Sequence, residues 1–205
     1  MKVRVFILAR ASKNNPKQLK YLLIVDGQTE EAYFKTIFQR FKISAKTIKR
    51  VAPSGGSAVS FGLSEAHTFE TTNHRSYESY YIIIDRDNLT SSEYQQIQRE
   101  INQNEDTRLV FSNVAIEVWL LAYYQQMTSR PVHSSADNDR NIRELSRHLG
   151  EAYQKGNSIQ IDKIINSAEH PIDTANNNTS SIRELCFDRQ CTNVGIFLQE
   201  LINGL

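Results

Sequence analysis

The chain has 205 residues and carries 24 Lys and Arg against 23 Asp and Glu, a formal net charge of +1 at pH 7. This near balance excludes a global positive field that would attract nucleic acid, so any such contact has to come from local basic patches. The two cysteines, Cys186 and Cys191, are too few for a zinc cage or a disulfide framework. Apolar runs stay well short of the roughly 18 residues of a membrane span, so we expect a soluble, cytoplasmic protein.

Short apolar runs alternate with stretches of helical periodicity in the first part of the chain. Apolar β-forming residues predict strands over residues 3–9, 21–26, 46–52, 80–85 and 108–111. Helices are predicted over residues 29–41, 57–69, 92–104 and 115–124, with Thr29 as the first N-cap, Ser91 or Ser92 as the third and Ser112-Asn113 as the fourth. This repeated order of strand and helix indicates an α/β fold, a Rossmann-like parallel sheet with helices on both faces.

The β-rich runs stop after residue 137, and helical periodicity takes their place. Helices are predicted over residues 141–153, 159–168, 180–187 and 193–203. Pro131 and several small polar residues indicate a boundary within residues 129–135. We therefore predict an α/β domain over residues 1–130 and a helical C-terminal region over residues 131–205.

Acidic side chains stand where the two most apolar strands end. Asp26 follows the first of these runs, and Asp85 and Asp87 follow the second. Glu30 and Glu117 fall in the first turns of two predicted helices that themselves follow strands. Because ligands collect at the carboxyl edge of an open parallel sheet, we expect the five carboxylates to converge there. One or two divalent cations would relieve their repulsion, and oxygen-only ligands favour Mg²⁺ or Mn²⁺ over zinc.

Each of these acids also has an ordinary structural interpretation. Asp26 precedes a glycine, as in many turns, and Asp85 with Asp87 would suit a solvated turn. Glu30 and Glu117 are early-helix acids of the kind that the helix dipole favours. Their combination at one predicted edge favours a cation site over five separate coincidences.

Two further features are candidates for binding a phosphate. Arg86 lies between two acids, where it would either point at a substrate or pair with a neighbouring carboxylate. Ser54-Gly55-Gly56 precedes a predicted helix and is either a phosphate nest or a plain turn. It lacks the Gly-Lys-Ser/Thr ending of a P-loop, so we do not expect the chain itself to be an ATPase. Trp119 lies among apolar residues and is interpreted as a core residue.

Four segments of the chain, in this order, resemble the motifs of one protein family, the RloB-like (AbiLii-type) proteins. Residues 22–34 resemble the family's opening motif, a strand that ends in an acid followed by Gly. Residues 81–87 are similar to its Asp-x-Asp strand, and residues 111–121 to its Ser-Asn-x-x-x-Glu-x-Trp-x-Leu segment. Residues 192–201 resemble its terminal helix.

The resemblance implies a Toprim catalytic domain and a metal-dependent nuclease that acts on DNA or RNA. It also implies a role in prokaryotic anti-phage defence, in the manner of abortive infection, beside a partner ATPase. By position, Asp85 and Asp87 would be metal ligands, and Asp26 would stand where the family usually has Glu, as metal ligand or general acid/base. Glu30 and Glu117 are the other acidic motif positions, and both would be catalytic. Glu30 is the alternative metal ligand to Asp26, and an unliganded Asp26 or Glu117 would shuttle the proton of the attacking water.

The chain departs from the family pattern at Asp26. An Asp carboxylate is set back from that of Glu by one C–C bond, roughly 1.5 Å, and Mg²⁺ tolerates little error in ligand distance. The leading function is a Mg²⁺- or Mn²⁺-dependent phosphodiester hydrolase, and the alternative is a catalytically weak regulatory or binding subunit of the ATPase. A primase-like nucleotidyl transferase is a third possibility. The sequence leaves open whether the chain forms a homo-oligomer.

Overall fold

The computed structural model describes residues 20–49, 58–73, 77–86 and 89–203. The strand predicted over residues 3–9 lies outside these ranges, as do Asp87 and the Ser54-Gly55-Gly56 segment. Among the helices that are described, none is long and apolar enough to cross a membrane.

A five-stranded, mostly parallel sheet forms the centre of the protein, with the strand order β2-β1-β3-β4-β5. The strands are β1 (Tyr21–Val25), β2 (Ala45–Lys49), β3 (Ser79–Asp85), β4 (Thr107–Asn113) and β5 (Cys191–Thr192). β1 to β4 are parallel, and β5 pairs with β4 in the antiparallel direction. Val25 pairs with Ile83, so the residues that follow β1 and those that end β3 lie at the same carboxyl edge.

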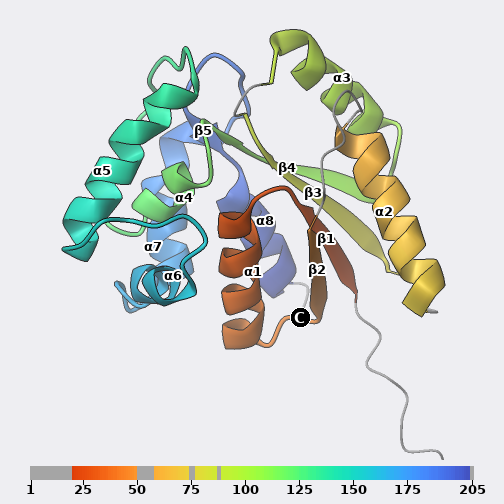
Figure 1. Ribbon diagram of the computed structural model, residues 1–205, viewed down its shortest axis with the longest axis horizontal. Helices are drawn as coiled ribbons and strands as arrows, with labels where there is room; N and C mark the ends of the chain where they lie inside the picture. The colour runs from red at the N-terminus through yellow and green to blue at the C-terminus, as the bar shows by residue number, and fades with distance from the viewer. Residues whose placement is uncertain (1–19, 50–57, 74–76, 87–88, 204–205) are drawn as a thin grey trace, which may run out of the picture.

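Helices cover both faces of the sheet, as the sequence predicts (Figure 1). One face carries α2 (Ala58–Asn73) and α3 (Ser91–Asn102), and the other carries α1 (Gln28–Phe41) and α8 (Val194–Asn203). Alternate residues of the central strands point to opposite sides, as a pleated strand requires. In β1, Leu23 belongs to the core beneath α1 and Ile24 to the core beneath α2. Continuous apolar runs are therefore what a sheet buried on both faces needs.

The remaining helices lie beside α1, on the same side of the sheet (Figure 1). They are α4 (Glu117–Leu121), α5 (Asn138–Leu149), α6 (Ser158–Ile165) and α7 (Pro171–Asn178). Residues from both halves of the chain share one hydrophobic core, in which Phe197 of α8 packs against Phe34 of α1 and Tyr81 of β3. The division at residues 129–135 stays a prediction, and the described structure shows a core that is continuous across it.

Several predicted elements are corrected in the second half of the chain. The helix predicted over residues 180–187 is only a 3₁₀ turn at Ser180–Ile182, and α7 and β5 were not predicted. Pro171 occupies the first turn of α7, a position that Pro favours and that could have indicated this helix. β5 has two residues, too few for a periodic signal.

Helix ends were also predicted with errors of a few residues. Gly27 is the N-cap of α1 in place of Thr29. Thr90 caps α3 in place of Ser91 or Ser92, because its hydroxyl accepts from the Glu93 amide while the Glu93 carboxylate accepts from the Thr90 amide. The helix predicted over residues 115–124 is the shorter α4, with Ile116 as its N-cap.

Candidate functional site

A cavity of about 220 Å³ lies at the carboxyl edge of the sheet, where the sequence predicts the site. It is formed by the start of α1, the end of β3, the start of α4 and the loop between α5 and α6. The residues that line it are Gly27, Gln28, Thr29, Glu30, Asp85, Ile116, Glu117 and Lys155. Three of the predicted carboxylates, Glu30, Asp85 and Glu117, thus share one cavity. Asp26 directly precedes the lining residue Gly27, whereas Asp87 lies outside the described residues.

The Glu30 side chain folds back over the N-terminus of its own helix. Only 4% of its surface is exposed. A Cβ atom added to Gly27 would overlap the Glu30 carboxylate, and it would lie 2.8 Å from Glu30 Cδ. Gly27 has an ordinary extended conformation, with φ −105°, so a larger residue here would displace the Glu30 carboxylate without straining the backbone. An acid in the first turn is also favoured by the positive end of the helix dipole.

Glu117 is almost completely buried and is held by two side chains from the second half of the chain. Asn138 Nδ2 donates to Glu117 Oε2 at 2.9 Å, and the Tyr153 hydroxyl donates to Oε1 at 3.1 Å. Burial, and then the negative charge of Glu117, raises the pKa of Tyr153 well above its ordinary value. Tyr153 therefore remains a protonated donor at every physiological pH. A buried charge needs such donors, because an unpartnered carboxylate would be strongly destabilising.

Arg86 directs its charge toward the C-terminal half of the chain. Its Nη1 donates to the carbonyl of Val132 at 2.9 Å, and its guanidinium carbon lies 4.4 Å from the centre of the Phe187 ring. Its amide also donates to the Ser112 carbonyl at 3.1 Å. Among the described residues Arg86 forms no ion pair with a carboxylate, so these contacts anchor the end of β3. Its predicted role in substrate binding stays a prediction, as does that of Ser54-Gly55-Gly56.

The described part of the chain contains no group of three or more His, Cys, Asp and Glu side chains arranged to hold a metal ion. The acids that line the cavity nevertheless offer only carboxylate oxygens, the ligands that Mg²⁺ and Mn²⁺ prefer. Mg²⁺ commonly takes one or two carboxylates from the protein and completes its shell with water and substrate phosphate. The residues therefore fit such an ion in chemical type, with few protein ligands.

Trp119, two positions after Glu117, is a core residue as predicted. It is fully buried, and its Nε1 donates to the Tyr33 hydroxyl at 2.6 Å. That hydroxyl also shares a 2.7 Å hydrogen bond with the hydroxyl of Tyr123. This buried polar network joins α1 to α4 and so fixes the two helices whose first turns carry Glu30 and Glu117.

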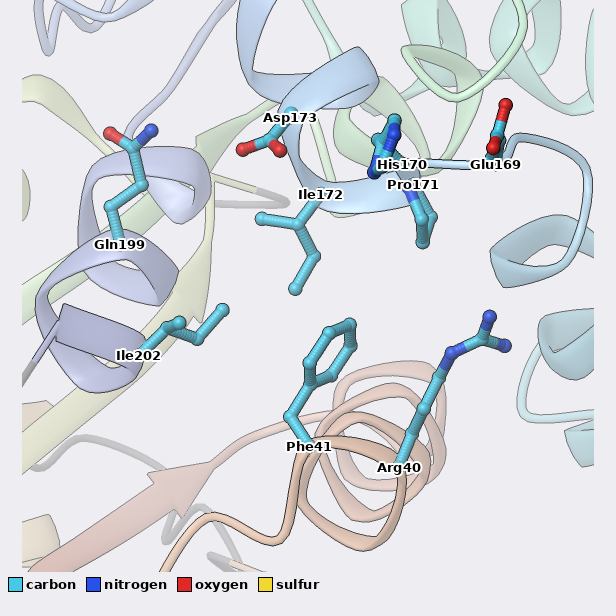
Figure 2. Close-up of a pocket in the computed structure, with 9 residues that line it drawn as sticks. All are labelled: Arg40, Phe41, Glu169, His170, Pro171, Ile172, Asp173, Gln199 and Ile202. Atoms are coloured by element: carbon cyan, nitrogen blue, oxygen red, sulfur yellow. The ribbon is translucent and has the colours of Figure 1, made fainter. Parts of the chain in front are cut away.

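A second cavity, of about 270 Å³, lies at the opposite end of α1 (Figure 2). Phe41, Ile172 and Ile202 point toward one another across its apolar centre, as Figure 2 shows. Arg40 and Asp173 at its rim are exposed, and Arg40 donates to the Asn166 side chain. α1 spans about 20 Å at 1.5 Å per residue, which separates this cavity from the acids at the helix start. Glu169 and His170 also line this cavity, around the apolar centre.

Sequence reasoning missed three side chains that complete the acid-lined cavity. Asn138 and Tyr153 hold Glu117, and Lys155 lines the cavity itself. Each comes from the region predicted to be helical, and Tyr153 and Lys155 lie in a loop. Nothing in the local sequence indicates that this loop lies against the start of α1.

The fold and the site define an α/β protein with a mostly parallel sheet and with carboxylates gathered at its carboxyl edge, the usual place for ligands in such sheets. Comparison with protein families identifies the class more closely. Residues 21–201 match the family described as RloB-like protein, and the chain belongs to this family. No curated protein and no solved structure matches the chain.

Proposed function

We propose that this RloB-like protein is a Mg²⁺- or Mn²⁺-dependent phosphodiester hydrolase of the Toprim type that cleaves DNA or RNA. One observation carries the proposal: carboxylates from three separate chain segments line a single cavity at the carboxyl edge of the sheet. Such a gathering of acids is electrostatically costly and is typical of a site that holds a cation. In a prokaryotic host, the activity would serve anti-phage defence by abortive infection, beside a partner ATPase.

Asp85 would be the principal metal ligand, together with Asp87 and with Glu30 or Asp26. When bound, a divalent cation would polarise the scissile phosphate and lower the pKa of the attacking water. A carboxylate that does not hold the metal would take the proton from that water, as a general base. Glu30 suits this role if Asp26 binds the metal, because its side chain lines the cavity. Asp26 suits it if Glu30 is the ligand.

Glu117 is better suited to shaping the site than to moving a proton. Both of its carboxylate oxygens already accept hydrogen bonds, from Asn138 and Tyr153. An oxygen that already accepts a hydrogen bond from a buried protein donor is less available to take a proton from water. We therefore propose that Glu117 lends negative charge to the cavity and fixes the position of α4.

The hydrogen bonds that Glu117 accepts favour the second candidate, a regulatory or binding subunit of the ATPase with weak catalysis or none. Since Glu117 accepts two hydrogen bonds and Asp26 is one methylene shorter than Glu, the cavity offers few carboxylates that could hold a metal tightly. In that case the protein would bind its partner without cleaving nucleic acid under any metal condition.

The test is cleavage of end-labelled DNA, RNA and tRNA by the purified protein with Mg²⁺, with Mn²⁺ and with EDTA. The informative variant is Asp85→Asn, which removes the charge of the predicted ligand and keeps its size. Asp173→Asn is the matched control, because Asp173 is an exposed acid at the other end of α1. We expect metal-dependent cleavage that survives in the control and is lost in Asp85→Asn, whose melting temperature should not fall.

Two results would reject the hydrolase. Cleavage that persists in EDTA or in Asp85→Asn would place the activity elsewhere or in a contaminant. If the wild-type protein cleaves nothing with either metal and binds tightly to the ATPase encoded beside it, the regulatory subunit is favoured.

A further inference from the structure

A lysine from the second half of the chain lines the acid-lined cavity. Lys155 belongs to the loop of residues 150–157 between α5 and α6, which runs to the N-terminal end of α1 (Figure 1). Among the described residues that line the cavity it is the only basic one, and it faces the same space as Glu30, Asp85 and Glu117. The roles proposed for the carboxylates do not involve it.

The loop is fixed against α1 at the residue next to Lys155. The Gly156 amide donates to Thr29 Oγ1 at 3.1 Å. Gly156 has φ +75°, a conformation that favours glycine. A Cβ atom there would lie 2.9 Å from the Cβ of Gln28, so the two backbones approach too closely for a larger residue. The contact holds the loop at the first turn of α1, one residue from Glu30.

Hydrogen bonds on the other side of the loop complete its attachment. The Tyr153 amide donates to Ser146 Oγ of α5 at 2.9 Å, while the Tyr153 hydroxyl reaches Glu117. Gln160 of α6 accepts from the Gln154 amide at 2.7 Å and donates to the Ala152 carbonyl at 2.9 Å. The position of Lys155 above the cavity is therefore set by contacts on either side of it.

The ammonium group of Lys155 is not paired within the described structure. Its ammonium forms no hydrogen bond or ion pair with any described residue, although three carboxylates line the same cavity. Two other lysines are paired, Lys163 with Glu151 at 2.5 Å and Lys35 with Glu31 at 2.6 Å. Lys155 is thus a cation held at the cavity with its donors available to a ligand.

A phosphate diester needs such a cation at a site lined with acids. Carboxylates repel the phosphate, and a divalent ion offsets this repulsion only where it binds. A lysine at the rim offsets the remainder and supplies three rotatable donors to the phosphate oxygens. We propose that Lys155 binds a phosphate oxygen of the nucleic acid substrate and positions the backbone against the carboxylates. This proposal rests on the proposed function, because it assumes a nucleic acid substrate at this cavity.

The rival interpretation is structural: Lys155 would merely lower the repulsion among the carboxylates. The two are separated by what Lys155→Gln changes, since glutamine removes the charge and keeps most of the stem. A structural counter-ion predicts a lower melting temperature and unchanged intrinsic affinity for nucleic acid. A phosphate ligand predicts weaker binding and a KM effect with little change in stability.

The experiment measures binding of fluorescein-labelled single-stranded DNA and RNA by anisotropy, in EDTA and over a series of salt concentrations. Lys155→Gln, Lys155→Ala and Lys155→Arg are compared with Lys163→Ala, a nearby exposed lysine outside the cavity. We expect the Gln and Ala variants to bind roughly tenfold more weakly, as for the loss of one charge-assisted hydrogen bond. The slope of log affinity against log salt should fall by about 1, while Arg retains most of the affinity and Lys163→Ala matches the wild type.

The outcomes distinguish this proposal from the hydrolase itself. If the wild type cleaves and Lys155→Gln has the same affinity, salt slope and KM, the role of Lys155 is rejected and the hydrolase stands. If the wild type binds without cleaving and Lys155→Gln weakens binding, the role of Lys155 stands and the hydrolase falls. If the wild type neither binds nor cleaves, both are rejected.

Discussion

The hydrogen bond between Tyr153 and Glu117 offers the sharpest test of how the second half of the chain supports the site. Tyr153→Phe removes only the hydroxyl that donates to Glu117 Oε1 at 3.1 Å and leaves the ring in place. Tyr153 is 8% exposed and Glu117 is 1% exposed, so water cannot readily replace the lost donor. Hydrogen bonds to charged groups contribute about 1.5–3 kcal/mol to the free energy of unfolding. For a chain of this size, the melting temperature should fall by roughly 3–12 °C.

The assay is thermal and urea unfolding followed by circular dichroism, with Tyr94→Phe as the matched control. Within the described ranges the Tyr94 hydroxyl accepts from Gln98 of the same helix alone, at 3.2 Å, so its loss should cost about 1 kcal/mol or less. Glu117→Gln and the double variant complete a mutant cycle, in which we expect a coupling energy of about 1–2 kcal/mol. Equal losses for the two Tyr→Phe variants, or a coupling energy near zero, would refute the reasoning.

Three other measurements test the packing around the site. Gly156→Ala should destabilise the protein more than Gly150→Ala, because both residues have positive φ but only Gly156 lies against α1; equal urea midpoints would contradict this. Tyr33→Phe should cost about 1–2 kcal/mol more than Tyr123→Phe, because it leaves both Trp119 and Tyr123 without their partner; differential calorimetry giving the reverse order would disprove the network. Burial raises the pKa values of Tyr33 and Tyr123 above the unfolded value of about 10. The stability that the two protonated hydroxyls contribute is therefore complete below about pH 10 and is lost as the pH rises further. An unfolding free energy that stays constant from neutral pH to pH 11 would exclude this linkage.

The central fold could be predicted because two of its strands are recognisable from their amino-acid sequence alone. The runs that became β1 and β3 are apolar without interruption, which fits strands buried on both faces of a sheet. The strand–helix order then required parallel pairing, and the pairing of Val25 with Ile83 confirms that both strands end at one edge. The shared edge of Asp26 and Asp85 follows from that order alone.

The errors fall where tertiary contacts override the local pattern. Residues 180–187 have helical spacing, yet the Asn113 side chain binds the carbonyls of Cys186, Phe187 and Arg189 and holds that backbone in an irregular loop. The loop leads into β5, whose two residues pair with the end of β4.

The acids of the candidate site could be placed from sequence, whereas their supports could not. Asp85 ends a strand, and Glu30 and Glu117 begin helices, so strand order alone brings them to one edge. Tyr153 lies 36 positions after Glu117 and reaches it only because α5 packs beside α4. Lys155 reaches the cavity only because Gly156 permits the loop to lie on Thr29. Neither contact has a periodicity or a motif that local sequence reasoning could detect.

The candidate site needs residues from both halves of the chain. The first half supplies the carboxylates, but the buried charge of Glu117 is partnered by Asn138 and Tyr153 from the second half. Without those donors Glu117 would be a desolvated and unpartnered charge, which a folded domain tolerates poorly. The α/β part is therefore not expected to keep its site if the chain is cut at residues 129–135, even though the sheet strands β1 to β4 all precede that point. The helical region then acts as one wall of the cavity, and the proposed chemistry belongs to both halves together.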